Sequence, residues 1–564
     1  MSAFLLETST KPSKMKKFIF FSLLFSTILY FSCTTKEKVD LIVHNGTIYT
    51  VDEGFSIANA FAIKDNRFVA VGNENAIFSK YESEEVIDLQ GKPVYPGFID
   101  SHSHFYRYGL GLQVADLLGA ESEAELVERV RVHAEKNPDA AWILGRGWDQ
   151  NLWESKEFPT KAKLDSLFPD KPVLLTRIDG HAALVNQKAL DLGGVTAQTS
   201  MIGGKVILIG NKPSGVLIDN AIDLVSSKVP NASKEESRIA LLGAQENCFA
   251  VGLTTVVDAG LEKETIDLIS EMQKDNTLKM RVYAMINPTE ANMAHYFKTG
   301  IYQDDNLTVR SFKIYGDGAL GSRGAALLKP YHDHADNYGF LLKNPEEFDE
   351  LAKKMYENGF QMNTHCIGDS ANRTLLDIYA KYLKGKNDLR WRIEHAQVVS
   401  KEDMPKFAQY SIIPSVQPTH ATSDMFWADE RLGDKRIKTA YTYKQLLAQN
   451  GWLPNGTDFP IEDISPIKTF FASVCRKNSE GLPDDGFQME NALTREQALR
   501  SITIWAAKAG FEETRKGSIE VEKSADFVVL DTDLMKCNDE AILRVKVLKT
   551  VLGGEIVSGA EINQ

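Results

Sequence analysis

The sequence predicts an α/β protein with a (β/α)8 barrel of the TIM type, a small β-sandwich domain formed from both termini, and an inserted region. Three observations lead to this fold. Apolar runs alternate with helical patterns through the middle of the chain, which indicates a parallel sheet. Polar residues follow these runs, as they do at the rim where barrel enzymes carry their sites. Both ends of the chain are rich in short strands.

Residues 1–33 have the pattern of an export signal. Met15-Lys16-Lys17 precedes "FIFFSLLFSTILYFSC", an apolar run that is short for a membrane span. Cys33 ends this run, which resembles a bacterial lipoprotein signal, although Tyr30 stands where leucine is usual. An uncleaved N-terminal anchor is the alternative. We therefore expect a protein of the cell envelope, periplasmic or lipid-anchored, whose contact with the membrane is made by this segment.

The composite β-sandwich is assigned to residues 39–95 and 505–564. "VDLIVHNGTIYTVD" alternates and turns at Asn45-Gly46, which predicts a hairpin, and "FAIKDNRFVAVG" repeats the pattern around Asp65-Asn66. Near the C-terminus, "ADFVVLD" and "VLKTVLGGEIV" predict short strands with a Gly-Gly turn. If both ends form one domain, the chain between them is an insertion with its own core.

The barrel is assigned to residues 96–504. Its first strand is "GKPVYPGFID", and later buried strands are predicted in "VGLTTVVDAG", "LTVRSFKIYGDG", "GFQMNTHCIGD", "LRWRIEHAQ", "SIIPSVQPTH" and "GWLPNGTDFP". Segments such as "NPEEFDELAKKMYENG" predict the helices between them. Residues 115–245 interrupt this rhythm, and we assign them to the inserted region.

Composition excludes several classes of protein. A chain of 564 residues with 43% hydrophobic and 25% charged residues is typical of a soluble globular protein of two or three domains. Its net charge of −13 argues against a nucleic-acid partner. The five cysteines form no C-x-x-C pair, so neither a zinc ribbon nor a redox motif is indicated. No second long apolar run exists, which excludes a transporter.

Two histidines close the first predicted barrel strand. His102 and His104 alternate in "FIDSHSHF", so both side chains leave the strand on one face. A polar loop start would explain them equally well in isolation. Lys313 lies inside the apolar run "VRSFKIYGDG", where burial of a lysine is costly and requires a reason.

Three further ligand-type residues follow other predicted strands. His365 comes after "GFQMNT", His395 after "RWRIE" and Asp458 after "LPNGT". Singly, each has an ordinary explanation as a polar strand end, or as an Asx turn for Asp458. Together, six such side chains at the ends of five strands of one barrel predict a metal site. Imidazole and carboxylate without cysteine suit zinc, or iron, manganese or nickel. The set exceeds the needs of one tetrahedral zinc, which leaves two metals, or one metal with catalytic groups.

These segments resemble the amidohydrolase superfamily. The similarity lies in "PGFIDSHSH", "THCIGD", "IEHAQ", "NGTDFP" and "KGSIEVEKSADFVVLD". "KIYGDGALGSRGAAL" and "DGHAALVN" resemble its YtcJ-like branch, amidohydrolase family 3, which includes N-substituted formamide deformylases. The resemblance covers roughly residues 39–560.

The resemblance implies one or two divalent transition-metal ions, zinc above all. His102 and His104 would bind the more buried ion. Lys313 stands where two-metal members carry a carboxylated lysine that bridges both ions. If Lys313 is unmodified, one ion with Lys313 beside it is the alternative.

The remaining ligands complete the implied site. His365 and His395 would hold the second ion. Asp458 would bind the first ion and act catalytically, because it would accept the proton of the attacking water and later deliver it to the leaving nitrogen.

Substrate-binding residues are proposed on weaker patterns. His181, within "DGHAALVN", and Arg323 match motifs of the branch, and Trp148 could form an apolar wall. Arg323 could bind a substrate carboxylate, but a structural salt bridge explains it equally well, as a satisfied buried histidine explains His181. Asp100 and Glu394 adjoin ligands and are expected to support them. The other histidines, which lack comparable context, are His44, His133, His295, His332, His334 and His420.

The sequence thus predicts a metal-dependent hydrolase that cleaves a C–N bond of a small amide, N-formyl compound or cyclic amide with metal-activated water. A homodimer is compatible with this prediction. One alternative is an aminohydrolase, a deaminase of the same superfamily. Such deaminases usually carry glutamate three residues after the third histidine, where this chain has Gly368. A metal-binding lipoprotein without turnover is a second alternative, but it predicts an incomplete ligand set.

Overall fold

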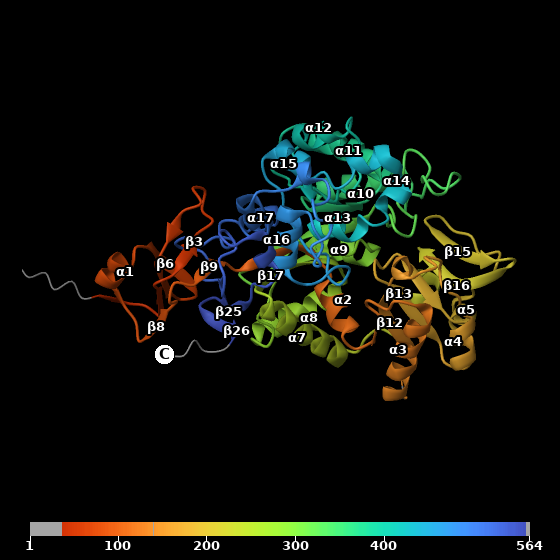
Figure 1. Ribbon diagram of the computed structural model, residues 1–564, viewed down its shortest axis with the longest axis horizontal. Helices are drawn as coiled ribbons and strands as arrows, with labels where there is room; N and C mark the ends of the chain where they lie inside the picture. Colours follow the sequence, from red (N-terminus) through yellow and green to blue (C-terminus); the bar gives the residue numbers. More distant parts are fainter. Residues whose placement is uncertain (1–35, 139, 560–564) are drawn as a thin grey trace, which may run out of the picture.

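The computed structural model describes residues 36–138 and 140–559. Along its long axis lie a β-rich part formed from both ends of the chain, the barrel, and a separate inserted sheet (Figure 1). The predicted signal segment, with Cys33, lies outside the described residues. Within the part of the chain that the structure describes, no helix combines the length and apolar character needed to cross a membrane.

The barrel contains seven consecutive parallel strands, so the predicted fold class is confirmed. A short strand, β19 (Tyr302–Gln303), pairs antiparallel with one of them. In barrel order the strands are β10 (Phe98–Ser103), β17 (Leu253–Leu261), β18 (Arg281–Ile286), β20 (Leu307–Tyr315), β21 (Gln361–Cys366), β22 (Arg392–His395) and β23 (Ile413–Ser415).

The eighth position of the barrel is occupied by an irregular segment at residues 453–458. On one side, Ser101 N donates to Asn455 O over 3.3 Å and Asp458 N donates to His102 O over 2.8 Å. On the other side, Asn455 forms a parallel bridge with Val416, just after β23. The segment therefore joins the first strand to the seventh and brings Asp458 to the barrel rim.

Helices connect successive barrel strands. The predicted helix in "NPEEFDELAKKMYENG" is α10 (Pro345–Glu357), where Asn344 and Glu347 form a capping box and Phe348 and Leu351 are buried. The other helices of this part are α2 (Phe105–Gly111), α7 (Lys234–Ala250), α8 (Lys263–Lys274), α9 (Glu290–Thr299), α11 (Asp369–Leu383), α12 (Met404–Gln409), α13 (Pro418–Asp424), α14 (Ala428–Arg436), α15 (Tyr443–Asn450), α16 (Pro466–Cys475), α17 (Arg495–Ser501) and α18 (Ile504–Ala509).

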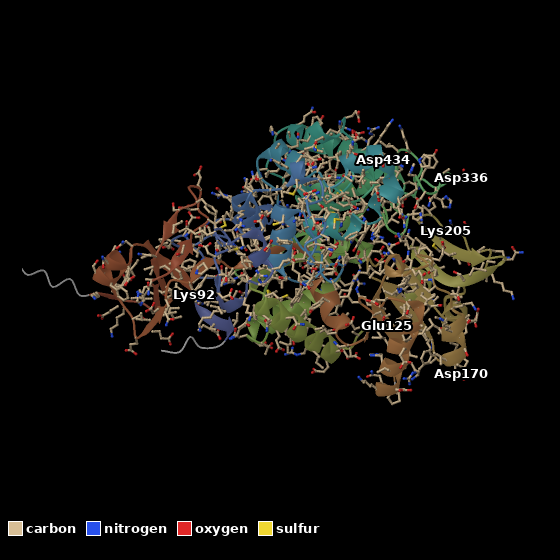
Figure 2. The ribbon with its side chains drawn as sticks, viewed as in Figure 1. Lys92, Glu125, Asp170, Lys205, Asp336 and Asp434 are labelled. Atoms are coloured by element: carbon tan, nitrogen blue, oxygen red, sulfur yellow. The ribbon has the colours of Figure 1, made fainter. Side chains whose placement is uncertain are left out.

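A separate six-stranded mixed sheet interrupts the barrel after α2. Its strands, in spatial order, are β11 (Ala115–Asp116), β12 (Ile143–Trp148), β13 (Val173–Arg177), β14 (Ala182–Val185), β16 (Lys212–Asp219) and β15 (Gly204–Ile209). Its helices are α3 (Glu123–Lys136), α4 (Ala162–Leu167), α5 (Gln187–Gly193) and α6 (Asp223–Ser226). Asp170 and Lys205 mark its outer surface (Figure 2). The next helix, α7, packs against α2 and β17 of the barrel.

Two larger sheets and a short parallel pair, β1 (Glu37–Lys38) with β7 (Tyr81–Glu82), form the β-rich part. One larger sheet has the order β6 (Arg67–Gly72), β5 (Ala60–Lys64), β2 (Leu41–His44) and β8 (Glu85–Asp88). The other has the order β26 (Glu555–Ser558), β25 (Val547–Leu552), β24 (Phe527–Leu530), β9 (Pro93–Pro96), β3 (Thr47–Tyr49) and β4 (Ile57–Ala58). Strand β24 from the C-terminus pairs with β9 from the N-terminus. Phe61 packs edge-on against Phe527, which joins the two sheets in one core.

The predicted hairpin at Asn45-Gly46 is wrong. β2 and β3, on either side of this turn, belong to different sheets. The turn passes the chain closely from one sheet to the other, because a Cβ at position 46 would lie 2.4 Å from the end of the Leu89 side chain and 3.2 Å from Lys92 O. The hairpin at Asp65-Asn66 is confirmed, because β5 and β6 pair antiparallel around it.

Candidate metal centre

The barrel brings the six predicted ligand residues to one rim. His102 is within β10 and His104 follows it, while Lys313, His365 and His395 are on β20, β21 and β22. Because parallel strands present their carboxyl ends on the same side, residues far apart in sequence become neighbours. The ring centroids of His102 and His395 are 4.8 Å apart, and those of His365 and His395 are 4.5 Å apart.

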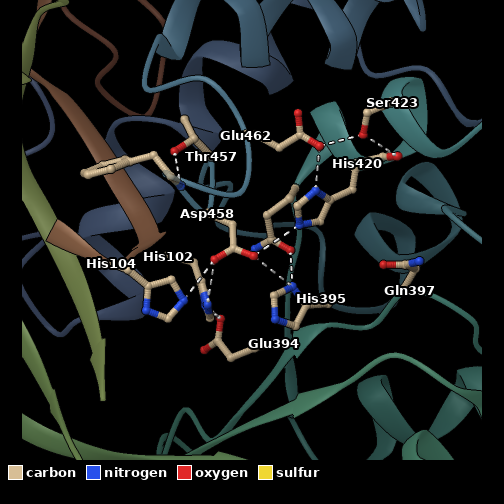
Figure 3. A network of polar contacts seen from close by, with 12 residues as sticks. His102, His104, Glu394, His395, Gln397, His420, Ser423, Thr457, Asp458 and Glu462 are labelled. Atoms are coloured by element: carbon tan, nitrogen blue, oxygen red, sulfur yellow. Dashed lines mark hydrogen bonds and ion pairs between the residues drawn. The ribbon is translucent and has the colours of Figure 1, made fainter. Parts of the chain in front are cut away.

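Three buried side chains form the closest cluster. His102, His395 and Asp458 offer ligand atoms that all lie within 4.8 Å of one another. Asp458 Oδ1 is also 3.2 Å from His104 Nε2 (Figure 3). Asp458 Oδ1 and His365 Nε2 are buried without a hydrogen-bond partner, and buried polar atoms normally have one. A carboxylate oxygen and an imidazole nitrogen without a partner in the protein are atoms that can bind a transition-metal ion.

Lys313 and His365 complete the set from neighbouring strands. Lys313 is almost fully buried, and its Nζ lies 3.0 Å from His102 Nε2. His365 Nε2 lies 3.7 Å from Asp317 Oδ1, and the ring of His365 is 4.5 Å from that of His395. Both residues therefore adjoin the cluster.

Hydrogen bonds fix the orientation of the imidazole rings. His102 Nδ1 lies 2.5 Å from Glu394 Oε2, and His104 Nδ1 lies 3.1 Å from the carbonyl oxygen of Ala259. Each contact engages Nδ1 and leaves Nε2 facing the site, as metal-binding histidines require. Glu394 thus has a supporting position.

Asp100 lies two residues before His102 on β10 and holds the backbone that carries the proposed ligands. It accepts hydrogen bonds from His102 N over 3.1 Å and from Thr457 Oγ1 over 2.7 Å. Because Thr457 precedes Asp458, Asp100 links the first strand to the irregular eighth segment.

Burial sets the protonation of the site. It lowers the pKa of His104 to about 3 and the pKa values of His365 and His395 well below the usual range. Neutral imidazole is the form that binds metal. Burial would raise the pKa of Asp458, but the neighbouring histidines hold it well below its usual range. Burial also lowers the pKa of Lys313 to about 8.

His420 belongs to the site, although it is among the histidines that lack comparable context in the sequence. Its Nε2 lies 3.2 Å from Asp458 Oδ2 and its Nδ1 lies 2.9 Å from Glu462 Oε1 (Figure 3). It lies in α13, five residues after the end of β23. A signal was present, because His420 ends the predicted strand segment "SIIPSVQPTH" in the way that His395 ends β22.

A cleft of about 1950 Å³ opens between the barrel rim and the inserted sheet, with His104, His365 and Asp458 in its lining. His181 also lines it. Its Nδ1 lies 2.6 Å from Asp219 Oδ1, and its ring is 5.1 Å from that of His365. His181 therefore reaches the metal centre from the inserted sheet.

Two predicted substrate contacts lie elsewhere. Trp148 is fully buried and donates from Nε1 to the backbone of Leu175 over 2.7 Å, within the core of the inserted sheet. The prediction that it forms a wall of the cleft is wrong, because its ring faces this core. Arg323 forms an ion pair with Asp333 over 2.9 Å and is not part of the cleft lining. Arg323 therefore forms a structural salt bridge, which was the alternative to substrate binding in the sequence analysis.

Comparison with known proteins agrees with this geometry. A family model described as "Amidohydrolase family" matches residues 85–558. The putative amidohydrolase YtcJ of Bacillus subtilis is 30% identical over 92% of this chain and 99% of its own. The N-substituted formamide deformylase of Arthrobacter pascens is 26% identical over 91% of this chain and 97% of its own. An uncharacterized metal-dependent hydrolase from Pyrococcus horikoshii has the same fold, with a TM-score of 0.71, 27% identity, and coverage of 88% of this chain and 99% of its own. The predicted resemblance is confirmed.

Proposed function

Because this chain belongs to the amidohydrolase family, we propose that it is a metal-dependent hydrolase specific for a C–N bond in a small amide, N-formyl compound or cyclic amide. The observation that carries the proposal is the buried cluster of His102, His395 and Asp458, whose ligand atoms lie within 4.8 Å of one another. This cluster is at the base of a cleft large enough for a small molecule.

The donor set suits one or two divalent transition-metal ions, with zinc the first choice for imidazole and carboxylate ligands. When bound, such an ion supplies the Lewis acidity that activates water and polarises a carbonyl group. His102, His104 and Asp458 would hold one ion, and His365 and His395 a second.

Proton transfer in this proposal belongs to Asp458. Its carboxylate accepts the proton of the attacking water at one oxygen and returns it to the leaving nitrogen. His420 holds the other oxygen, Oδ2, at 3.2 Å and so fixes the direction in which Asp458 acts. Asp219 orients His181 from the inserted sheet, which leaves the other ring nitrogen of His181 for the carbonyl oxygen of a substrate.

The backbone around Gly368 argues against the alternative function, deamination. A Cβ at this position would lie 1.9 Å from the carbonyl oxygen of Ala326. The glutamate of mononuclear deaminases therefore could not be placed here without moving the backbone. This observation favours amide hydrolysis over deamination.

We further propose that Lys313 is carboxylated. The ammonium of Lys313 would first lose a proton; the neutral amine would then add to carbon dioxide and lose a second proton, so that a buried cation becomes a bidentate anion beside His102. The support is its almost complete burial and the 3.0 Å contact of its Nζ with His102 Nε2. Crystallographic density for a carbamate at Nζ would confirm this proposal, and an unmodified amine in metal-loaded protein would refute it.

The function is tested with purified protein and a panel of N-formyl, N-acyl and cyclic amides. We expect one to two transition-metal ions per chain by elemental analysis, with hydrolysis of at least one class of amide. His102→Ala should lose both metal and activity. A folded protein that contains no metal after growth with zinc would contradict the proposal, as would release of ammonia from aminated heterocycles without amide hydrolysis.

The cell-envelope location is also a proposal, and it rests on the sequence of residues 15–33. Labelling of growing cells with palmitate should mark the wild-type chain and should leave a Cys33→Ala variant unlabelled. Equal label in both would exclude lipidation at Cys33.

A further inference from the structure

Of the arginines that line the cleft, one is paired with carboxylates of the described residues and two are not. Arg177 is fully engaged, because Asp179 Oδ2 lies 2.6 Å from its Nη1 and Asp149 contacts its other terminal nitrogen. Arg107 and Arg146 also line the cleft. Within residues 36–138 and 140–559, no carboxylate oxygen lies within 4.0 Å of either of these two guanidinium groups.

Arg146 is held beside the metal centre with donors to spare. It is half-buried on β12, where Nη2 donates to Ile178 O over 3.1 Å and the buried Nε has no hydrogen-bond partner. A Cβ on Gly180 would lie 3.8 Å from Arg146 Nη1, so the guanidinium lies against the residue before His181. The ring of His181 is 5.1 Å from that of His365. The guanidinium of Arg146 therefore has N–H donors close to His181 for which the described part of the protein provides no acceptor.

Arg107 approaches from the barrel side. It lies on α2, three residues after His104, and is exposed in the cleft lining. Burial and, to a smaller extent, the charge of Arg107 lower the pKa of Arg146 to about 10, so the two cations lie within electrostatic reach of each other. Two like charges held together at a cleft are stabilised by an anion between them.

The carboxylates of the cleft are already engaged. Their partners within the protein pair Asp149 and Asp179 with Arg177, Asp219 with His181, and Glu462 with His420. Asp458 is paired with His420, Asp424 accepts a hydrogen bond from Tyr441, and Glu236 accepts one from Ser233 N. Asp223, at the start of α6, has no such partner in the part of the chain that the structure describes: burial raises its pKa and the charge of Arg107 opposes this, so it lies within electrostatic reach of Arg107 although more than 4.0 Å away. Arg107 and Arg146 are therefore the lining guanidinium groups that no carboxylate of the described residues contacts within 4.0 Å.

We propose that Arg107 and Arg146 together bind a carboxylate of the substrate, so that the enzyme hydrolyses N-formyl or N-acyl derivatives of amino acids in preference to neutral amides. A guanidinium forms two parallel hydrogen bonds with a planar carboxylate, and this geometry confers selectivity as well as affinity. The inference rests on the proposed hydrolysis of a C–N bond and adds a substrate class to it. It also moves the carboxylate-binding role from Arg323 to two other arginines.

The test compares acids with neutral analogues on zinc-loaded protein. The substrates are N-formyl-β-alanine and N-formyl-4-aminobutyrate, each beside an analogue with a hydroxymethyl group in place of the carboxylate. Wild-type protein should favour one of the acids by at least about tenfold in kcat/KM. Arg146→Gln and Arg107→Gln should each reduce this acid-to-neutral ratio by about tenfold, chiefly through KM.

Lys156→Gln is the matched control. Lys156 lines the same cleft and carries the same charge, but it is paired with Glu430 over 3.2 Å. Its replacement should leave the ratio unchanged. Equal kcat/KM for acids and neutral analogues in wild-type protein would overturn the proposal, as would an equal loss of the ratio in Lys156→Gln.

A binding measurement separates this proposal from the hydrolytic function. If neither substrate class is hydrolysed, the proposed function fails, and calorimetric titration with the N-formyl acids still tests the arginines. Saturable binding of an acid that is weakened about tenfold in Arg146→Gln supports the carboxylate site. Absence of binding to folded wild-type protein, or tighter binding of the neutral analogues, refutes it.

Discussion

Replacement of Glu394 by glutamine tests how the barrel holds its metal. Glu394 is fully buried, with one carboxylate oxygen 2.5 Å from His102 Nδ1 and the other 2.6 Å from Arg392 Nε. Burial would raise the pKa of Glu394, but Arg392 and His102 hold it well below its usual range. The residue is therefore a buried anion with two partners, and glutamine keeps its shape while it removes the charge.

The expected effects follow from the two partners. Loss of one member of a buried ion pair costs about 3–5 kcal/mol because the other charge is left uncompensated. Arg392 keeps hydrogen bonds to Ser101 O and Ser415 Oγ, so we expect about 3 kcal/mol, the lower end of that range. His102 loses the carboxylate that orients its ring, which should weaken metal binding about 10- to 100-fold.

Two assays and one control separate these effects. Thermal unfolding of metal-free protein reports stability, and competition with a chelator reports zinc affinity. Asp526→Asn is the control, because Asp526 forms a similarly buried pair with Arg281, 2.7 Å apart, away from the metal centre. Both variants should lose stability, but Glu394→Gln alone should lose zinc affinity. If zinc binds Glu394→Gln as tightly as wild-type protein, the argument that Glu394 orients His102 is refuted.

Three further predictions concern single residues. His420→Gln should retain zinc but lose at least about 100-fold in kcat, because Asp458 loses the imidazole at its Oδ2; an unchanged kcat would contradict the role of His420. Gly368→Ala should lower the thermal midpoint, at a cost of about 1–3 kcal/mol, because its Cβ meets a backbone oxygen. Gly111→Ala is the control, because the Cβ there meets open space, and it should leave the thermal midpoint unchanged. Equal changes of the thermal midpoint in both variants would refute the steric argument. Asp403→Asn should be destabilised at pH 7, with a gap from wild type that narrows below about pH 4.

The sign of this pH effect follows from the pKa of Asp403. Burial would raise it, but hydrogen bonds from Lys406, Ser400 and Arg373 lower it below its usual value. A carboxyl group whose pKa is lower in the folded chain stabilises the protein above its unfolded pKa, and this stabilisation is lost as the pH falls through the folded pKa. Urea unfolding of wild type and variant between pH 3 and 7 measures the gap, and a gap independent of pH would contradict the assignment.

The metal cluster could be predicted from the sequence because its signals are local. His102, His365 and His395 each lie at or near the end of a fully buried strand, and the parallel topology alone brings strand ends together. His420 was missed because Gln417 and Pro418 separate it from β23 and place it in a helix. Strand β18 was also missed, because no ligand-type residue marks its end.

The orientation of the inserted sheet could not be predicted, and Trp148 shows why. Strict alternation along β12 would place Arg146 and Trp148 on the same face. The register between β12 and β13 shifts between these two residues, and Gly147 has a φ of 110°, a conformation that glycine adopts readily. This bulge turns Trp148 into the core and leaves Arg146 in the cleft.

The two parts of the cleft are therefore under different constraints. The proposed metal ligands His102, His365 and His395 are on barrel strands whose register fixes the distances between them, so a slip of β10 or β22 should lose the proposed site. Arg146 and His181 are on the inserted sheet, which has its own core and contacts the substrate rather than the metal in the mechanism proposed above. Changes in this sheet should then alter which acids are accepted while zinc content is retained. On this argument, the bulge at Gly147 determines substrate selectivity, because it decides whether position 146 or position 148 faces the cleft.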